Sequence, residues 1–290
     1  MPYKEPPTDA LDAGHTLARH TVALRLDDIQ VEIAPPAGIA AGDRSTGERL
    51  GPLSAAVDRG GYQLVTGPNG AGKSALMSVI ALERPAASGR LVLLGKEVRL
   101  SGKRSDRARL RRHLGLVFQS LYPLPGATVL ETVLLPIALN PHAPDAGTQP
   151  GQAGERTIAA ARELLHWVGL AGRDHDRADS LSGGESRCLA LARSLIGRPQ
   201  MLIADDPTRG LDERGAWRMM GLIEQLHRHG TTIILATNDP SILQASPHPR
   251  LELSARRRSL HPRTEFMASP TPSTGSGIGS GHWTGPGSRA

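Results

Sequence analysis

This chain has very little cysteine and no long run of apolar residues. Cys188 is the only cysteine, which excludes a disulfide within one chain and a metal site built from several cysteines. The longest apolar run, Val129–Leu139, is interrupted by Glu131 and Pro136. It falls short of the roughly 18 apolar residues that indicate a membrane-spanning helix. We therefore expect a protein of a reducing cytoplasm, whose role at a membrane would come through a partner.

Negative charge is in the minority. The chain has 34 Lys and Arg against 28 Asp and Glu, a formal net charge of +6. Such a balance permits contact with nucleic acid or an anionic membrane, but charge that only solvates the surface is the simpler interpretation. We expect no specific nucleic-acid partner. Residues 1–20 are polar, lack the apolar core of a secretory signal and predict a disordered N-terminal extension. The Arg-, Ser-, Pro- and Gly-rich residues 254–290 predict a disordered tail.

The remaining pattern predicts strands alternating with helices, as in an α/β protein. Strands are expected at Thr21–Ile33, Leu50–Val57, Tyr62–Thr66, Leu91–Leu94, Lys96–Leu100, Leu114–Phe118, Met201–Ala204 and Thr231–Ala236. Helices are expected at Ser101–Arg112, Thr128–Leu139, Glu155–Val168, Ser186–Leu195 and Arg214–Arg228. Pro- and Gly-rich residues predict loops at 34–48 and 140–154.

The segment from Gly67 to Ser74 fits the phosphate-binding P-loop pattern G-x-x-x-x-G-K-[ST], with a strand before it and a helix after it. Glycines let successive backbone N–H groups point at one anion, and the helix presents its positive end to the same phosphates. Lys73 is expected to reach the β- and γ-phosphates, and Ser74 to ligate Mg²⁺. The predicted nucleotide-binding residues are Gly67, Pro68, Asn69, Gly70, Ala71, Gly72, Lys73 and Ser74.

Five more motifs follow the P-loop in a fixed order. Each is weak alone, because an aspartate after an apolar strand, for example, is common. They are Val117-Phe118-Gln119, Leu181-Ser182-Gly183-Gly184-Glu185, the strand Met201–Ala204 with Asp205-Asp206, and Gly210-Leu211-Asp212, after which Leu235-Ala236-Thr237-Asn238-Asp239 ends the last apolar strand.

Together these motifs resemble the ATP-binding-cassette (ABC) ATPases over roughly residues 22–245. The residues around Gln119 and the run Leu130–Pro136 are similar to the lipoprotein-releasing and macrolide-export branch, which also includes a cell-division ATPase. The resemblance implies a P-loop NTPase fold: a RecA-like α/β core, an antiparallel β part at the N-terminus and an inserted helical subdomain at about residues 120–182. The ATPase domain would then span residues 21–253.

The resemblance also implies roles for individual residues. ATP and Mg²⁺ would bind at the P-loop, with Ser74, Gln119 and Asp205 at the metal. The signature residues Ser182, Gly183, Gly184 and Glu185, together with Asp212, would close over the nucleotide of a second subunit, in a homodimer or a heterodimer. Hydrolysis would act on transmembrane permease subunits from the inner face of the cell membrane, where this chain would be peripheral.

Three positions depart from the family pattern. Asp206 stands where the family usually has the glutamate that polarises water, and Asn238 stands where it has a histidine. Asp206, Asn238 and Gln119 are the candidate catalytic residues. Asparagine can donate a hydrogen bond but cannot become a cation. Ile33 lies near the position of the adenine-stacking aromatic, and no aromatic residue occurs between Tyr3 and Tyr62.

These departures leave two interpretations open, a slow ATPase and the hydrolysis-poor half of an asymmetric dimer. A non-transport, ATP-driven regulator of cell-envelope processes is a further alternative. The signature motif argues against a P-loop kinase. The lack of a long coiled-coil insertion argues against the DNA-repair relatives of the fold.

Overall fold

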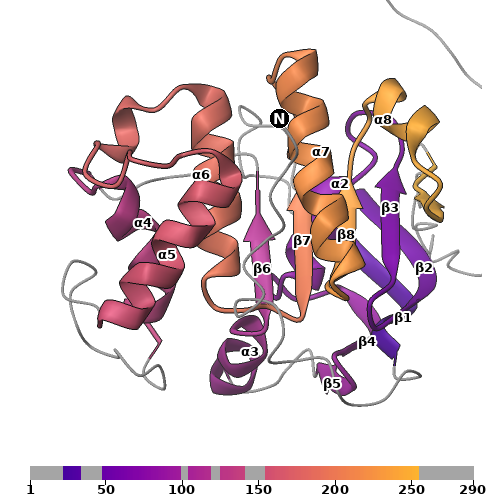
Figure 1. Cartoon of the computed structure of the whole chain (residues 1–290). Coiled ribbons are helices and arrows are strands. Elements are labelled where there is room, and N and C mark those ends of the chain that lie inside the picture. Colours follow the sequence, from indigo (N-terminus) through magenta and orange to yellow (C-terminus); the bar gives the residue numbers. More distant parts are fainter. Residues whose placement is uncertain (1–21, 34–47, 99–103, 119–124, 141–153, 255–290) are drawn as a thin grey trace, which may run out of the picture. The chain divides into compact units, whose positions relative to one another are not determined.

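The computed structural model describes residues 22–33, 48–98, 104–118, 125–140 and 154–254, whose strands form two sheets (Figure 1). An antiparallel sheet has the strand order β2-β1-β4-β5 and contains β1 (Val22–Ile33), β2 (Glu48–Asp58), β4 (Ser88–Leu93) and β5 (Lys96–Val98). A parallel sheet has the order β6-β7-β8-β3-β9 and contains β3 (Tyr62–Thr66), β6 (Leu114–Val117), β7 (Met201–Asp205), β8 (Thr232–Ala236) and β9 (Arg250–Glu252).

Helices cover the sheets and build a separate helical region. They are α2 (Lys73–Ile80), α3 (Arg104–Arg111), α4 (Val129–Ala138), α5 (Glu155–Val168), α6 (Gly183–Leu195), α7 (Glu213–Arg228) and α8 (Pro240–Ala245), with a short 3-10 helix at Ala178–Ser180. Helices α4, α5 and α6 pack against one another (Figure 1). The first turn of α4 is fixed by a reciprocal cap: Thr128 Oγ1 accepts from the backbone N–H of Glu131, and Glu131 accepts from that of Thr128.

The parallel sheet is apolar because both of its faces are covered. Every residue of β7 and β8 is buried. Successive side chains of a strand point to opposite faces, so Leu202 and Ala204 join one core with α5, α6 and α7, whereas Met201 and Ile203 join another with α2 and the antiparallel sheet. This sheet is therefore the middle layer of three, and its strands β7 and β8 carry polar residues only at their ends.

The expected parallel core and N-terminal antiparallel part are confirmed, and each predicted strand and helix occurs with its ends shifted by a few residues. One boundary was wrong: α6 begins at Gly183 and not at Ser186, because Ser182 caps it. Three elements were missed, α8, β9 and the 3-10 helix at Ala178–Ser180, because each is too short for a periodic pattern to reveal it. Helices α4 and α5 lie within the range predicted for a helical subdomain, and the domain boundaries stay predictions.

Several expectations fall outside the part of the chain that the structure describes. They concern the N-terminal extension, the loops at 34–47 and 141–153, the residues from 255 onward, and Gln119. Within the described ranges, no helix combines the length and the apolar character needed to cross a membrane.

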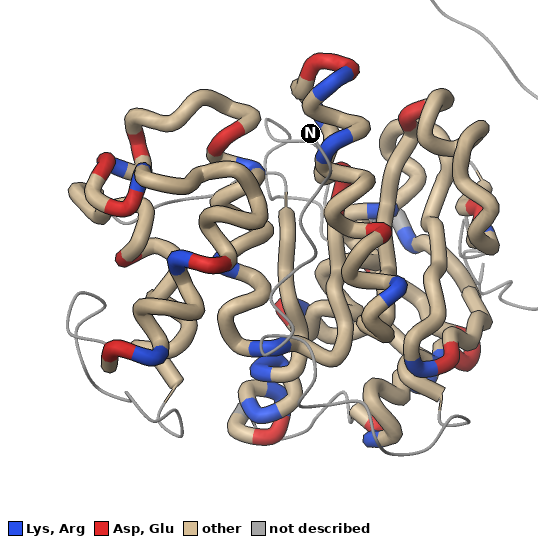
Figure 2. Tube along the Cα trace, viewed as in Figure 1, with Lys and Arg blue, Asp and Glu red and all other residues tan. Residues whose placement is uncertain are grey.

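Helix α3 carries much positive charge, as Figure 2 shows. Its buried contact to the core is Leu110, while Arg109 and Arg111 are exposed. Arg111 lies 3.6 Å from Glu83 in an exposed ion pair, which contributes little to stability. These arginines occupy a solvated helix face, as the sequence indicated.

Candidate functional site

Three strand ends bring the predicted motifs to one edge of the parallel sheet. Strand β3 leads into the P-loop, β7 ends at Asp205, and β8 lies between them and leads to Thr237. Backbone hydrogen bonds extend the sheet past these ends, from Asp206 N–H to Ala236 O at 2.8 Å and from Thr237 N–H to Val65 O at 3.1 Å. Ligand sites of open α/β sheets lie beyond the carboxyl ends of the strands, and the motifs meet at such an edge.

The P-loop encloses the ammonium group of Lys73. The Lys73 Nζ donates to the carbonyl oxygens of Gly67 at 2.8 Å and Pro68 at 3.2 Å. Partial burial lowers the pKa of Lys73, and the nearby Asp206 and Asp205 oppose that shift. The loop therefore places one cation at the start of α2, where the positive end of the helix also attracts an anion.

Asp205 and Ser74 meet although they come from β7 and from the first turn of α2. The side chain of Ser74 hydrogen-bonds the Asp205 carboxylate. Burial raises the pKa of Asp205, and Asp206 raises it further, while the Ser74 hydrogen bond and Lys73 lower it. A hydroxyl and a buried carboxylate form an oxygen donor set of the kind that hard divalent cations prefer. The pair therefore fits Mg²⁺.

Asp206 has a backbone conformation that most residues avoid. Its φ is 51°, in the left-handed region, which aspartate tolerates better than most residues with a side chain. The conformation is held by Asp206 N–H bonding Ala236 O and by Arg209 N–H bonding Asp206 O at 3.2 Å. Burial raises the pKa of Asp206, and the positive charges of Arg209, Lys73 and Arg187 oppose this. A strained carboxylate residue at this edge is typical of a functional position.

Asn238 contacts the P-loop directly. Its Nδ2 donates to the side-chain Oδ1 of Asn69 at 2.8 Å. The segment that carries it is rigid, because Thr237 is fully buried and its Oγ1 accepts from Asp239 N–H at 3.1 Å, while the Asp239 side chain caps α8. The side chains of Asn69 in the P-loop and of Asn238 in the segment after β8 are thus joined across the site.

The signature residues lie at the exposed N-terminus of α6. Ser182 caps this helix and exchanges hydrogen bonds with Glu185, whose N–H reaches Ser182 Oγ at 3.3 Å. Glu185 also accepts from Arg173 at 2.8 Å, and its pKa is lowered chiefly by the Ser182 hydrogen bonds and then by Arg173. Ser182 and Gly183 are exposed, and the contacts of Glu185 run to Arg173 and not to the P-loop. The signature therefore stands apart from the phosphate loop of its own chain.

The segment from Gly210 to Asp212 lies beside the start of α6. A side chain added at Gly184 would lie 3.5 Å from Leu211, and one added at Gly210 would lie 3.7 Å from Arg187. Asp212 caps α7, since its Oδ1 accepts from Gly215 N–H at 2.9 Å. In this structure Asp212 thus has a local capping role, and its expected role toward a nucleotide remains a prediction.

Two sets of contacts around the P-loop have no signal in the amino-acid sequence. Leu253, which follows β9, donates its N–H to Thr66 O at 2.7 Å, and its own carbonyl oxygen would lie 2.4 Å from a Cβ at Gly67. Ile33 and Leu50 press on the other end of the loop, at 3.0 and 3.1 Å from a Cβ at Gly72. Gly67 is therefore required by close packing against backbone as well as by its positive φ angle, whereas Gly72 is favoured chiefly by its positive φ angle.

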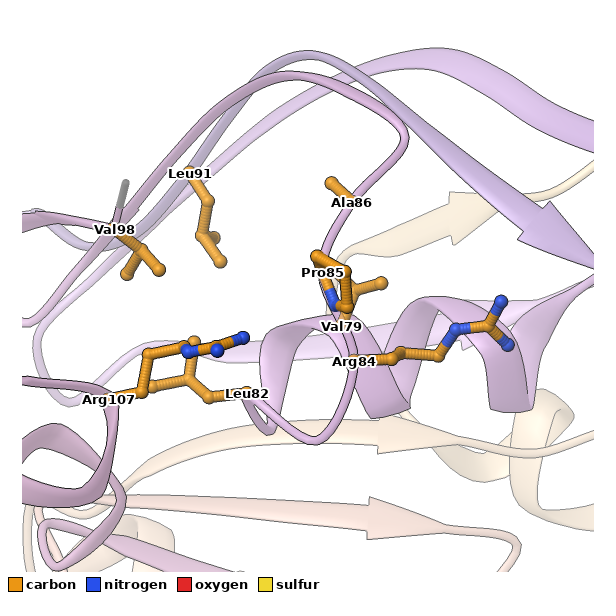
Figure 3. A pocket seen from close by; sticks show the side chains of 8 residues that line it. All are labelled: Val79, Leu82, Arg84, Pro85, Ala86, Leu91, Val98 and Arg107. Atoms are coloured by element: carbon orange, nitrogen blue, oxygen red, sulfur yellow. The ribbon is translucent and has the colours of Figure 1, made fainter. Parts of the chain in front are cut away.

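A small apolar hollow lies away from these motifs, among the end of α2, β4, β5 and α3 (Figure 3). Apolar side chains line it, including Leu82, Leu91 and Val98. In Figure 3 Arg84 extends away from it, and the Arg84 guanidinium donates to Glu32 O at 2.6 Å. None of the predicted site residues lines this hollow.

Comparison with known proteins gives a consistent result. Residues 50–209 match the family model described as ABC transporter. An uncharacterized ABC transporter ATP-binding protein of Thermotoga maritima is 36% identical over 193 residues, which are 66% of this chain and 78% of that protein. A cell division ATP-binding protein of Bacillus subtilis is 32% identical over 194 residues, 67% of this chain and 80% of that protein.

Among solved structures, the dimeric structure of a bacterial ABC transporter cassette superimposes with a TM-score of 0.66 at 22% identity. The match covers 80% of this chain and 94% of that one. At this level of identity the likeness concerns the fold.

Proposed function

The chain belongs to the ABC transporter family as an ATP-binding cassette, and from that premise we propose that it is the ATP-hydrolysing subunit that drives export or extraction through transmembrane partner subunits. The observation that carries this proposal is the meeting of Lys73, Asp205 and Asp206 at one edge of the parallel sheet. Their charges suit a polyphosphate with a divalent cation: the Lys73 ammonium lies in the P-loop against the carbonyl oxygens of Gly67 and Pro68, and Asp205 and Asp206 lie near enough to influence its pKa.

We propose that Ser74 and Asp205 hold Mg²⁺, with Gln119 as a further ligand. The hydrogen bond between Ser74 and Asp205 supports this, because it brings two oxygen groups from different elements together. The raised pKa of Asp205 fits the same idea, since a bound cation would offset the cost of burying the carboxylate. When bound, Mg²⁺ neutralises charge on the phosphate oxygens.

We propose a role for each remaining residue of the site. The P-loop amides and Lys73 bind and orient the β- and γ-phosphates. Asp206 is the group that takes the proton of the attacking water. Asn238 donates a hydrogen bond to the γ-phosphate. Because Asp206 is shorter than the usual glutamate and Asn238 cannot become a cation, we expect slow hydrolysis.

The exposed signature supports a dimer. Ser182 and Gly183 open α6 with the positive end of the helix directed to solvent, and the contacts of Glu185 run to Arg173 and not to the P-loop. A second subunit, identical or homologous, supplies the nucleotide that this helix end contacts. We place the assembly at the inner face of the cell membrane, where ATP hydrolysis would act on a permease subunit.

A second candidate function is the hydrolysis-poor half of an asymmetric dimer, favoured by the altered pair Asp206 and Asn238. A regulator of cell-envelope processes is favoured by the similarity to the Bacillus subtilis cell division protein. Both candidates share the nucleotide site, and they differ from the first in turnover or in the membrane partner.

Lys73→Ala tests the proposal. ATP at about 100 times its Kd should stabilise the wild-type chain by about 2.7 kcal/mol, which corresponds to a rise in Tm of roughly 5–10 °C for a domain of this size. The variant should lose this rise, because it lacks the cation that the P-loop encloses. Lys96→Ala, which removes an exposed lysine from β5, is the matched control and should keep the rise. Equal stabilisation of folded Lys73→Ala by ATP would contradict the nucleotide site.

A further inference from the structure

The side chain of Asn69 is hydrogen-bonded to Asn238, one of the positions at which the site departs from its family. P-loop residues bind phosphate chiefly through their backbone N–H groups, which leaves the Asn69 side chain without a role in the phosphate cradle. Its Oδ1 instead accepts from Asn238 Nδ2 at 2.8 Å, between residues that are 169 positions apart.

We propose that Asn69 is a positioning residue that holds the Asn238 amide with its NH₂ group toward the γ-phosphate of ATP. The inference rests on the nucleotide-binding function proposed above. It adds a residue that determines whether the site distinguishes ATP from ADP.

The chemistry of an amide explains why such a residue is needed. The two ends of an asparagine side chain have nearly the same shape, but one donates hydrogen bonds and the other accepts them. A phosphate oxygen only accepts, so an Asn238 amide turned the wrong way would repel it. Asn238 Nδ2 has two hydrogens. One bonds Asn69 Oδ1, and the other remains for the phosphate.

Asn69 is suited to hold this amide because its own backbone is fixed. It lies in a turn that is closed by Ala71 N–H bonding Pro68 O at 3.1 Å, and the next residue, Gly70, has a φ of 79°. A positive φ at this third position is what a type II turn requires. Lys73 also binds the carbonyl of Pro68, so the loop that carries Asn69 is tied at both ends.

The partner segment is equally constrained. Thr237 N–H bonds Val65 O, and the buried Thr237 hydroxyl accepts from Asp239 N–H. The Cα of Asn238 is therefore held between two fixed residues, and what is left to decide is the orientation of its amide. The hydrogen bond from Asn238 Nδ2 to Asn69 Oδ1 sets that orientation.

The inference predicts a loss in ATP preference that does not depend on hydrolysis. Dissociation constants for ATP and ADP are measured by calorimetry on the full chain, and their ratio reports contacts to the γ-phosphate. Asn69→Ala should reduce the preference for ATP about tenfold, as expected when one hydrogen bond to a charged group is lost. Asn238→Ala should reduce it by a similar factor. The double variant should lose no more than Asn238→Ala alone, because both changes remove one contact.

Two further variants separate this from a structural effect. Asn69→Ser keeps an oxygen that can accept a hydrogen bond and should recover part of the preference. Asn140→Ala, the same truncation after α4, should leave both dissociation constants unchanged. Melting temperatures without nucleotide should agree among the Asn69 variants, because Asn69 is exposed.

The outcomes distinguish this inference from the function on which it rests. If wild type binds neither nucleotide, the proposed function and the inference both fail. If wild type prefers ATP and Asn69→Ala keeps that preference, or if the two alanine variants have additive effects, only the positioning role of Asn69 is overturned. A wild type that binds both nucleotides equally would also overturn it.

Discussion

Replacing the altered catalytic pair, Asp206→Glu together with Asn238→His, should raise ATP turnover. The first change lengthens the carboxylate side chain by one C–C bond, about 1.5 Å. The second supplies an imidazole, which donates a hydrogen bond and can also carry positive charge. Both groups act on one water and one γ-phosphate. Their effects should therefore be non-additive, and kcat should rise more than KM falls.

The structure sets the size of the gain and the cost. A transition-state donor or a well-placed base contributes roughly 10²-fold or more in rate, so the double variant should gain about that factor. Asp206 has a φ of 51° and is held there by Ala236 and Arg209, and glutamate tolerates this conformation less well. We expect Asp206→Glu to cost about 1 kcal/mol of stability, a fall in Tm of roughly 2–4 °C. Asn238→His also removes the 2.8 Å bond to Asn69.

The assay is steady-state ATP hydrolysis by purified wild type, both single variants and the double variant, with and without the membrane partner. Melting temperatures measured alongside show whether each variant is folded. The reasoning is refuted if wild type already turns over at about 1–10 s⁻¹ and the double variant is no faster. If every variant binds ATP but none hydrolyses it, the chain is the non-hydrolysing half of an asymmetric dimer.

Three other predictions follow from particular contacts. Gly67→Ala would place a Cβ 2.4 Å from the carbonyl oxygen of Leu253. Thermal denaturation should therefore show a lower Tm, and calorimetry should show a loss of ATP binding. A variant with an unchanged Tm and unchanged ATP binding would contradict the role of β9 in supporting the P-loop. The pKa of His227 is lowered, mainly by burial and also by His248 and Arg228, while Glu224 opposes the shift. As pH falls, His227 is therefore protonated in the unfolded chain before it is protonated in the folded one, and stability should fall below about pH 6.5. When Tm is followed from pH 8 to 5, it should fall less in His227→Gln than in wild type. Saturating ATP should shift wild type toward a dimer in light scattering, alone or with its membrane partner, and Lys73→Ala should remain monomeric; a wild type that stays monomeric in both settings would refute dimerisation through Ser182.

Much of the fold could be predicted because its elements have clear local patterns. The fully buried strands Met201–Asp205 and Thr232–Ala236 and the amphipathic helix α7 were predicted to within a few residues. Strand β9 could not be predicted in this way. It has three residues, of which Arg250 and Glu252 are exposed, and it exists because the P-loop strand offers it a partner at the sheet edge.

The same distinction holds for the candidate site, of which one part could be predicted from local motifs and another part could not. The chemical groups of the site could be read from the sequence alone. The P-loop, the paired carboxylates and the signature are contiguous motifs, and their residue types indicate their chemistry. The sequence also indicated that Asp206 and Asn238 are the unusual members.

How these groups act on one another depends on the way the elements pack together. The order of strands in the sheet brings Asn238 to Asn69, Ser74 to Asp205 and Leu253 to Gly67. The left-handed backbone of Asp206 is held by contacts with Ala236 of β8 and with Arg209 in the loop that follows β7. A local pattern carries information about neighbours within one turn or one strand, whereas these contacts join residues from different elements. The packing of apolar strands between two cores sets that arrangement, and the polar residues at the strand ends take their positions from it.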